Sequence, residues 1–169
     1  MKPIDYDYFS NYWLNQQKSA KHMPKDDVLK HIKNFINNHN CFAFASGCNS
    51  FVRCTPIEYT YMNDKFYFFS EGGQKFKALK ENNNVSMAIY EYHGDLNDSH
   101  GLQITGEASV YSSDEDIFKE VLDYMHIPFD AIKALNVPTV LIEVGVKEYE
   151  MYDTDFVKNG YDVRQIITF

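Results

Sequence analysis

The sequence predicts one mainly β domain with flanking helices (α+β), in which six mostly antiparallel strands close into a barrel. Three observations support this fold class. The chain has 169 residues, enough for a single core and little more. Aromatic residues make up 16% of it, and aromatic side chains favour strands. The strand-like segments are joined mostly by short turns, which connect antiparallel neighbours.

The first predicted element is a helix that ends near Asn37. Asp26 or Asp27 could cap its start, and apolar side chains recur through it at helical spacing. The clearest hairpin follows later, with Asn63–Asp64 as its tight turn. In chain order, the other predicted elements are strands at 41–46, 51–61 and 65–70, a short helix at 74–81, strands at 85–92 and 101–111, helices at 114–125 and 129–135, and a strand at 140–149.

The domain organisation follows from these elements. We expect residues 1–25 to form an N-terminal arm that could pack against a partner subunit. Residues 26–152 should form the barrel domain, and residues 153–169 a C-terminal extension packed on it. No apolar segment approaches the ~20 residues of a membrane span, and the first residues do not resemble a signal peptide. Three cysteines without CxxC spacing are consistent with reduced thiols. A cytoplasmic location is therefore expected.

The net charge of −8 bears on the class of partner. A chain this acidic has no evident basic patch for nucleic-acid phosphates, and an anionic membrane surface would repel it. We therefore expect neither nucleic acid nor membrane as a partner.

Three segments, in this order, resemble the pyridoxamine 5'-phosphate oxidase superfamily. Residues 52–58 are similar to a family strand with an arginine near its start. Residues 68–86 resemble a strand, a Gly/Ser turn, a lysine, a short helix and the entry to the next strand. Residues 102–108 are similar to the family pattern Q-V-x-G-x-A. The resemblance implies a six-stranded, FMN-binding split β-barrel and a homodimer with the cofactor between its subunits.

The resemblance also implies the cofactor site. Arg53 and Lys75 would contact the FMN phosphate, which suits a bidentate guanidinium and a lysine at a helix N-terminus. Gln103 would contact the flavin, and the backbone near Phe69 would border it. Arg53 could instead be a surface cation, and Gln103 could simply pair across the sheet. The implied cofactor-binding set is Arg53, Cys54, Thr55, Pro56, Phe68, Phe69, Ser70, Gln74, Lys75 and Gln103.

The sequence departs from the vitamin B6 oxidase in three places. Gln74 replaces a basic residue of the phosphate site, and Glu58 stands where the oxidase has a lysine for its substrate. The oxidase's C-terminal tryptophan and arginine motif is also missing. The chain therefore looks less like a genuine pyridoxamine phosphate oxidase than like the general-stress or nitroimidazole-reductase-like branch.

Two hypotheses for function remain. The first is an FMN-dependent oxidoreductase that passes electrons from a reduced nicotinamide to a small flat acceptor. In such an enzyme the flavin carries the chemistry, and no catalytic side chain is identified. The second is a non-catalytic or stress-related protein that binds flavin, deazaflavin or haem.

The histidines offer one further alternative. His93 and His100, with Asp95 and Asp98, flank a loop that could hold a metal, and His93 or His126 could serve a haem. A loop rich in Asn and Asp is more often simply solvated, so we predict no metal site.

Overall fold

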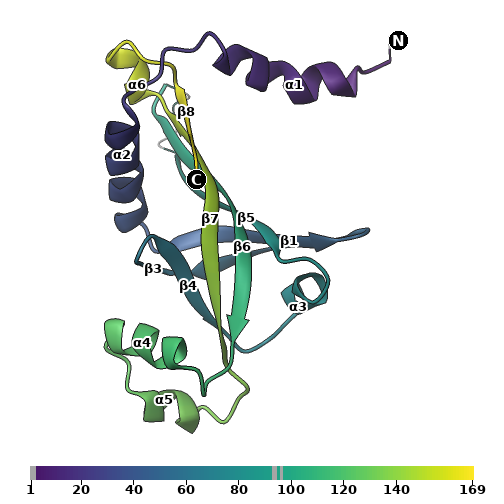
Figure 1. The fold of residues 1–169 in the computed structure, drawn as a ribbon, viewed down its shortest axis with the longest axis vertical. Coiled ribbons are helices and arrows are strands. Elements are labelled where there is room, and N and C mark those ends of the chain that lie inside the picture. The colour runs from purple at the N-terminus through teal and green to yellow at the C-terminus, as the bar shows by residue number, and fades with distance from the viewer. Residues whose placement is uncertain (1–2, 93–94, 96) are drawn as a thin grey trace.

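The computed structural model describes residues 3–92, 95 and 97–169 of the chain (Figure 1). A strongly curved antiparallel sheet forms its centre. The strand order is β2-β1-β5-β6-β7-β4-β3, and β8 pairs with β7 outside this path. The strands are β1 (Cys41–Cys48), β2 (Phe51–Glu58), β3 (Thr60–Met62), β4 (Lys65–Ser70), β5 (Asn84–Tyr92), β6 (Ser99–Tyr111), β7 (Val140–Asp153) and β8 (Arg164–Thr168).

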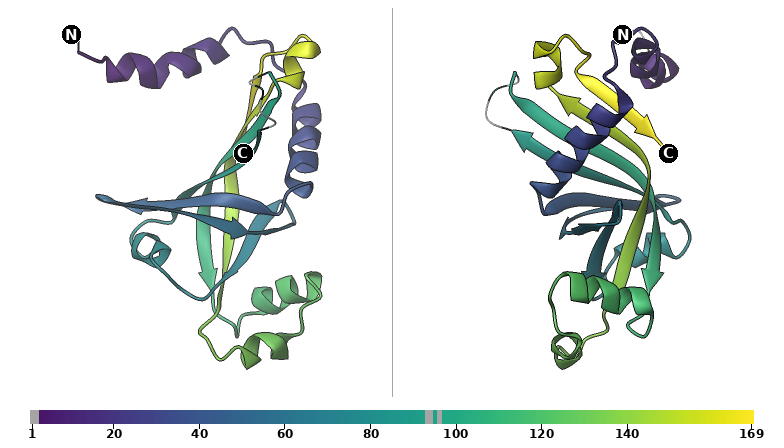
Figure 2. Two further views of the ribbon diagram at one scale, coloured as in Figure 1. Left: turned by 180° about the vertical axis from the view of Figure 1, so that it is seen from behind. Right: turned by 60° about the vertical axis from the view of Figure 1, so that its left-hand side comes forward.

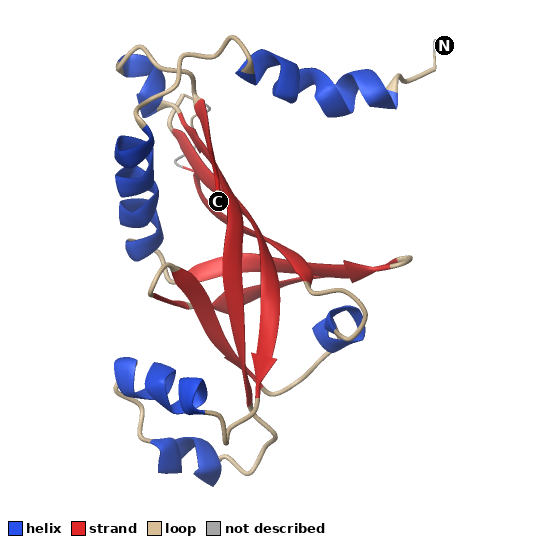
Figure 3. Cartoon of the chain, in the orientation of Figure 1, coloured by secondary structure: helices blue, strands red, loops and turns tan. Residues whose placement is uncertain are grey.

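The described part of the chain also has six helices. Figure 2 shows α2 lying along the sheet near β7 and β8, and Figure 3 shows α4 and α5 grouped at the end opposite α1. None of the described helices is long and apolar enough to cross a membrane. The helices are α1 (Tyr6–Gln17), α2 (Lys25–Asn37), α3 (Lys75–Leu79), α4 (Asp116–Tyr124), α5 (Phe129–Ala134) and α6 (Asp155–Lys158).

Side-chain alternation along the strands produces the main core. Phe42 and Phe44 of β1 point to the same side as Met87 of β5 and Leu102 of β6, and all four are buried. Val28, Ile32, Phe35 and Ile36 of α2 belong to the same cluster. A second cluster forms where α4 packs on the far ends of β4 and β7. The curved sheet therefore has one buried face and one open face.

The predicted fold class, a mainly β sheet with flanking helices, is confirmed. The structure has eight strands in its described part instead of six, and two differences account for this. The predicted strand 51–61 is divided at Tyr59 because β2 pairs with β1 whereas β3 pairs with β4. The Tyr59 hydroxyl donates a hydrogen bond to the Ile36 carbonyl oxygen at 2.7 Å and fixes this break. β8 lies within the segment expected as a C-terminal extension.

Several helix boundaries differ from the prediction. Neither Asp26 nor Asp27 is the N-cap of α2, because the helix begins at Lys25 after Pro24. The two carboxylates lie in the first turn, where the helix dipole still favours them. The predicted helix 74–81 is only the five residues of α3.

The largest difference is α1, which the sequence did not predict. It is a 12-residue helix without a buried side chain in this chain. Most of its large side chains are exposed, for example Tyr6 at 77%, Phe9 at 64% and Trp13 at 50%. A helix that buries no face carries no hydrophobic period, which explains why the sequence pattern gave no signal.

Gly106 allows the close approach of β6 and β7. The register between these strands shifts between Thr105 and Gly106, and the two strands bend together there. A Cβ atom added at Gly106 would lie 2.6 Å from the Gly145 carbonyl oxygen and 2.7 Å from a Val144 methyl carbon. Such distances require the backbone to move.

We therefore expect Gly106→Ala to lower the free energy of unfolding by about 1–3 kcal/mol, because it overpacks this bulge. Gly101→Ala is the matched control, since the nearest atom to a Cβ at Gly101 is 3.8 Å away. Urea denaturation of both variants measures the difference. Equal stability of the two variants would show that the bulge does not constrain the sheet.

Candidate functional site

Two cations lie together beside the β1–β2 hairpin. Arg53 is on β2, and Lys75 is the first residue of α3, which packs against β1 and β2. Burial lowers the pKa of the Lys75 ammonium, and the nearby positive charge of Arg53 lowers it further. Among the residues that the structure describes, no carboxylate forms an ion pair with either cation. The arrangement is therefore suited to an anion.

The turn before α3 holds Lys75 in place. Gly72 and Gly73 have φ values of 113° and 102°, a conformation that other residues rarely adopt. The Lys75 ammonium donates to the Gly72 carbonyl oxygen at 2.7 Å. The Ser70 hydroxyl accepts from the Gly72 N–H at 3.2 Å, so the end of β4 is tied to the same turn. These contacts fold the lysine back toward the turn.

The N-terminus of α3 contributes little to this candidate anion site. With five residues, α3 is too short to have a substantial dipole, so the side-chain cations dominate. Gln74 precedes the helix with an exposed side chain that makes no capping hydrogen bond. The role of Gln74 at the cofactor stays a prediction.

Ser46 is a residue that sequence reasoning missed. It lies directly opposite Arg53 in the β1–β2 register, so both side chains point to the same face. Ser46 is 3% exposed, and its hydroxyl has no hydrogen-bond partner in the described structure. A buried hydroxyl left unpaired is costly, and an anion at Arg53 would offer it an acceptor. A serine within a strand gives no sequence signal for this role.

The open face of the sheet carries a row of small side chains. The registers place Pro56, Ala43, Ala88 and Gln103 side by side across β2, β1, β5 and β6. A shallow pocket of about 380 Å³ lies on this row, and Cys54, Pro56, Ala88 and Tyr90 are among its lining residues. Such a flat, largely apolar surface suits a planar ring.

Gln103 is held at the end of this row. Its amide donates to Glu150 at 3.3 Å, and Glu150 forms an ion pair with Arg164. The Arg164 guanidinium lies 4.8 Å from the centre of the Trp13 ring. The orientation of Gln103 thus depends on β7, on β8 and, through Trp13, on the arm.

The predicted site residues do not form one cluster in a single chain. Arg53 and Thr55 point to the core side of β2, whereas Cys54 and Pro56 point to the open side. β2 is an edge strand of the sheet. A ligand could therefore contact side chains on both faces of the sheet only by passing around this edge.

The three predicted residues of β4 differ in burial. Phe68 is buried in the core against Phe42 and Phe44. Phe69 is half-buried and packs on Phe118. The Ser70 side chain is buried beside the Gly72 turn. Ser70 is therefore the only one of the three whose side chain contacts the turn that holds Lys75.

The histidine cluster has a structural explanation. His31 and His100 both contact Asp153, at 2.7 Å and 3.0 Å, and Asp153 is 2% exposed. Burial of His100 opposes its protonation, but its hydrogen bonds to Asp153 and Asp98 outweigh this effect and raise its pKa. The described residues contain no group of side chains arranged to bind a metal, and His93 lies outside them. His126 is exposed on the loop after α4.

The fold and the paired cations define a split-barrel protein with a candidate anion site. The sequence profile described as pyridoxamine 5'-phosphate oxidase matches residues 28–153, and the chain belongs to this family. The resemblance seen in the sequence is thereby confirmed. A comparison with curated protein sequences finds no match.

Solved structures share the fold at low identity. Campylobacter jejuni ChuZ is 17% identical, with a TM-score of 0.63 over 99% of this chain and 70% of that one. A Bacteroides thetaiotaomicron protein assigned to 5-nitroimidazole antibiotic resistance is 18% identical, with a TM-score of 0.58 over 71% of this chain and 80% of that one. A Mesorhizobium loti FAD-binding protein is 16% identical, with a TM-score of 0.55 over 72% and 89% of the two chains.

The site geometry makes a direct prediction about Lys75. Because a neighbouring cation disfavours the charged ammonium, Arg53→Gln should raise the Lys75 pKa toward its ordinary value. An NMR titration of the lysine ε-CH₂ signals measures this shift. Arg164→Gln is the control, since Arg164 is paired with Glu150 on β7. An unchanged Lys75 pKa in Arg53→Gln would contradict the proximity of the two cations.

Proposed function

We propose that this protein binds FMN and uses it to reduce a small flat substrate at the expense of a reduced nicotinamide. The observation that carries the proposal is the pair of cations, Arg53 and Lys75, held together without a carboxylate partner among the described residues. Like charges so placed cost free energy unless an anion joins them. A phosphate group satisfies both cations and the unpaired Ser46 hydroxyl.

The other residues of the site have distinct roles in this proposal. The small side chains of Ala43 and Ala88 leave room for a flat ring on the open face of the sheet, and Gln103 offers an amide at its end. A bound flavin would supply the redox chemistry, accepting two electrons from a nicotinamide and passing them to the substrate. The protein positions the ring and limits its access to water. A catalytic acid or base is not required.

Glu58 bears on the class of substrate. It is exposed at the end of β2 and lines a pocket of about 190 Å³ with Tyr59, Thr60 and Phe69. A carboxylate in this position repels a phosphorylated substrate such as a B6 vitamer. The proposed substrate is therefore neutral or cationic, and the proposal excludes the vitamin B6 oxidase reaction.

A second copy of the chain completes the proposed site. Arg53 and Gln103 lie on opposite faces of one sheet. One FMN molecule can therefore most directly contact an Arg53 with its phosphate and a Gln103 with its ring if it lies between two subunits. The Tyr6 and Phe9 side chains of α1 are also 77% and 64% exposed in their own chain. We propose a homodimer in which α1 packs on the partner.

The proposal predicts that the purified protein takes up FMN and that Arg53→Gln and Lys75→Gln each weaken this binding at least about tenfold, since each removes a charge-assisted hydrogen bond. Flavin fluorescence quenching measures the affinity. Lys80→Gln is the matched control, because the Lys80 ammonium is exposed and pairs with Glu81. In analytical ultracentrifugation the FMN-loaded protein should sediment as a dimer, and a monomer that binds FMN tightly would contradict the shared site.

Bleaching of the bound flavin by NADH or NADPH, followed by reoxidation with an acceptor, tests the enzymatic part of the proposal. A yellow protein that neither nicotinamide reduces would support the alternative of a flavin-binding protein without turnover. A colourless protein that takes up no added FMN would contradict both proposals. A coloured protein whose absorbance spectrum is that of haem or deazaflavin would contradict FMN as the cofactor.

A further inference from the structure

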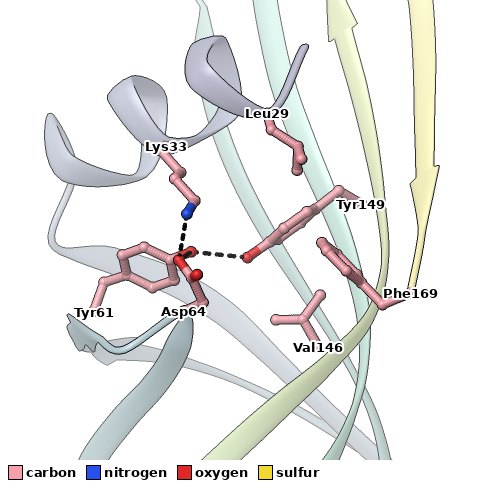
Figure 4. A pocket seen from close by; sticks show the side chains of 7 residues that line it. All are labelled: Leu29, Lys33, Tyr61, Asp64, Val146, Tyr149 and Phe169. Carbon is pink, nitrogen blue, oxygen red and sulfur yellow. Dashed lines mark hydrogen bonds and ion pairs between the residues drawn. The ribbon is translucent and has the colours of Figure 1, made fainter. Parts of the chain in front are cut away.

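A second pocket lies on the opposite side of the fold from the cations. It has a volume of about 300 Å³, is partly open to solvent, and lies between α2, the β3–β4 turn and β7. Figure 4 shows Leu29 and Lys33 entering from α2, and Tyr149 and Phe169 forming the opposite wall. The pocket shares no lining residue with the proposed flavin site. The lining residues are Leu29, Lys33, Tyr61, Asp64, Val146, Tyr149 and Phe169.

One end of this pocket is apolar and aromatic. Leu29 and Val146 provide aliphatic walls, and the rings of Tyr149 and Phe169 meet edge to face with their centres 5.6 Å apart. Tyr149 belongs to the main core, which fixes the inner part of this wall, whereas Phe169 is 65% exposed at its outer part. A cavity of this size and shape fits a single flat ring.

The other end is a corner of ordered polar groups. The Tyr61 hydroxyl donates to Asp64 Oδ1 at 3.1 Å, so its contact with the Tyr149 hydroxyl at 3.3 Å leaves Tyr149 as the donor. Burial raises the pKa of Tyr149 to about 12, so the phenol keeps its proton at neutral pH. Tyr149 therefore still has an oxygen lone pair available as an acceptor.

Lys33 and Asp64 complete the corner with both kinds of hydrogen-bonding group. The Lys33 ammonium contacts Asp64 Oδ1 at 2.6 Å and keeps two further N–H donors. Both contacts to Asp64 use Oδ1, which leaves Oδ2 as an acceptor. The Lys33 donor and the Asp64 acceptor together complement a ligand group that has an acceptor beside a donor. An amide edge, with a C=O beside an N–H, is such a group.

We propose that this pocket is a second small-molecule site, for a flat ring that carries a carboxamide or lactam edge. The ring lies between Leu29 and Val146, against Tyr149 and Phe169. The ligand carbonyl accepts from Lys33, and its N–H donates to Asp64 Oδ2 or to the Tyr149 oxygen. One ligand molecule thereby contacts both the apolar wall and the polar corner of the pocket.

Benzamide is the probe that tests this site, with methyl benzoate and ethylbenzene as matched ligands that lack the N–H or the whole amide. Titration of the full-length protein, followed by the methyl NMR signals of Leu29 and Val146, locates and measures binding. Benzamide should shift these signals and bind at least about fivefold more tightly than either comparator, as expected for one added hydrogen bond. Equal binding of all three ligands would overturn the assignment of an amide.

Two pairs of variants separate the pocket from general effects on the fold. Val146→Phe should fill the pocket and abolish the shift of the Leu29 methyl signals, whereas Val157→Phe, an exposed position on α6, should leave it unchanged. Asp64→Asn should weaken benzamide binding at least about fivefold, because the amide removes the charged acceptor. Asparagine tolerates the positive φ of 61° at this turn position, so the hairpin should remain intact.

Benzamide binding that survives Val146→Phe, or a lack of Leu29 and Val146 shifts at the highest soluble concentration, would overturn the proposal. Since the pocket and the flavin site share no residue, FMN binding in the same samples gives an independent result. A lack of benzamide binding would therefore leave the proposed FMN site unaffected, and a lack of FMN binding would leave the proposed second site unaffected.

Discussion

The pairing of β6 with β7 is the constraint on which the rest of the structure depends. β5 attaches to β6, whereas β4 and β8 both attach to β7, so this pair joins the two parts of the sheet. Its bulge at Gly106 lets the strands bend. The same pairing sets Glu150 opposite Gln103. β7 also pairs with β4, whose end leads into the Gly72–Gly73 turn before Lys75. Both ends of the candidate site therefore rest on one strand pair.

Much of the fold could be predicted from the sequence, because strand runs and turn residues are local signals. The Asn63–Asp64 turn is correctly predicted, with both residues at positive φ. The α1 helix was missed because it buries no face, and the Tyr59 break was missed because only the pairing partners change there. The candidate site was harder. Ser46 matters only through its register with Arg53, and Gln103 contacts a glutamate 47 positions away. Such relations depend on strand order, which a sequence pattern does not contain.

The fold is that of the family, whereas individual side chains determine the charge and shape of the candidate sites on it. Arg53 and Lys75 provide two cations where Gln74 offers none, so the proposed anion site would rely on this pair and on the unpaired Ser46 hydroxyl. Glu58 sets the sign of the charge at the neighbouring pocket. On the far side of the sheet, the Tyr61–Tyr149 contact ties β3 to β7 and at the same time shapes a separate cavity. The sheet thus carries two chemically different candidate sites, a cationic one at the β2 edge and an aromatic one beneath α2.

We propose that Arg53 and Lys75 together hold a phosphate group. The affinity of the unmodified protein for FMN, relative to its affinity for riboflavin, tests this proposal most directly. The two ligands share the flavin ring and differ by the phosphate alone. If Arg53 and Lys75 each form a charge-assisted hydrogen bond to it, FMN should bind about a hundredfold more tightly than riboflavin, and added salt should reduce the ratio. Equal affinities for the two flavins would contradict the account, because they would show that the cations take no part in binding.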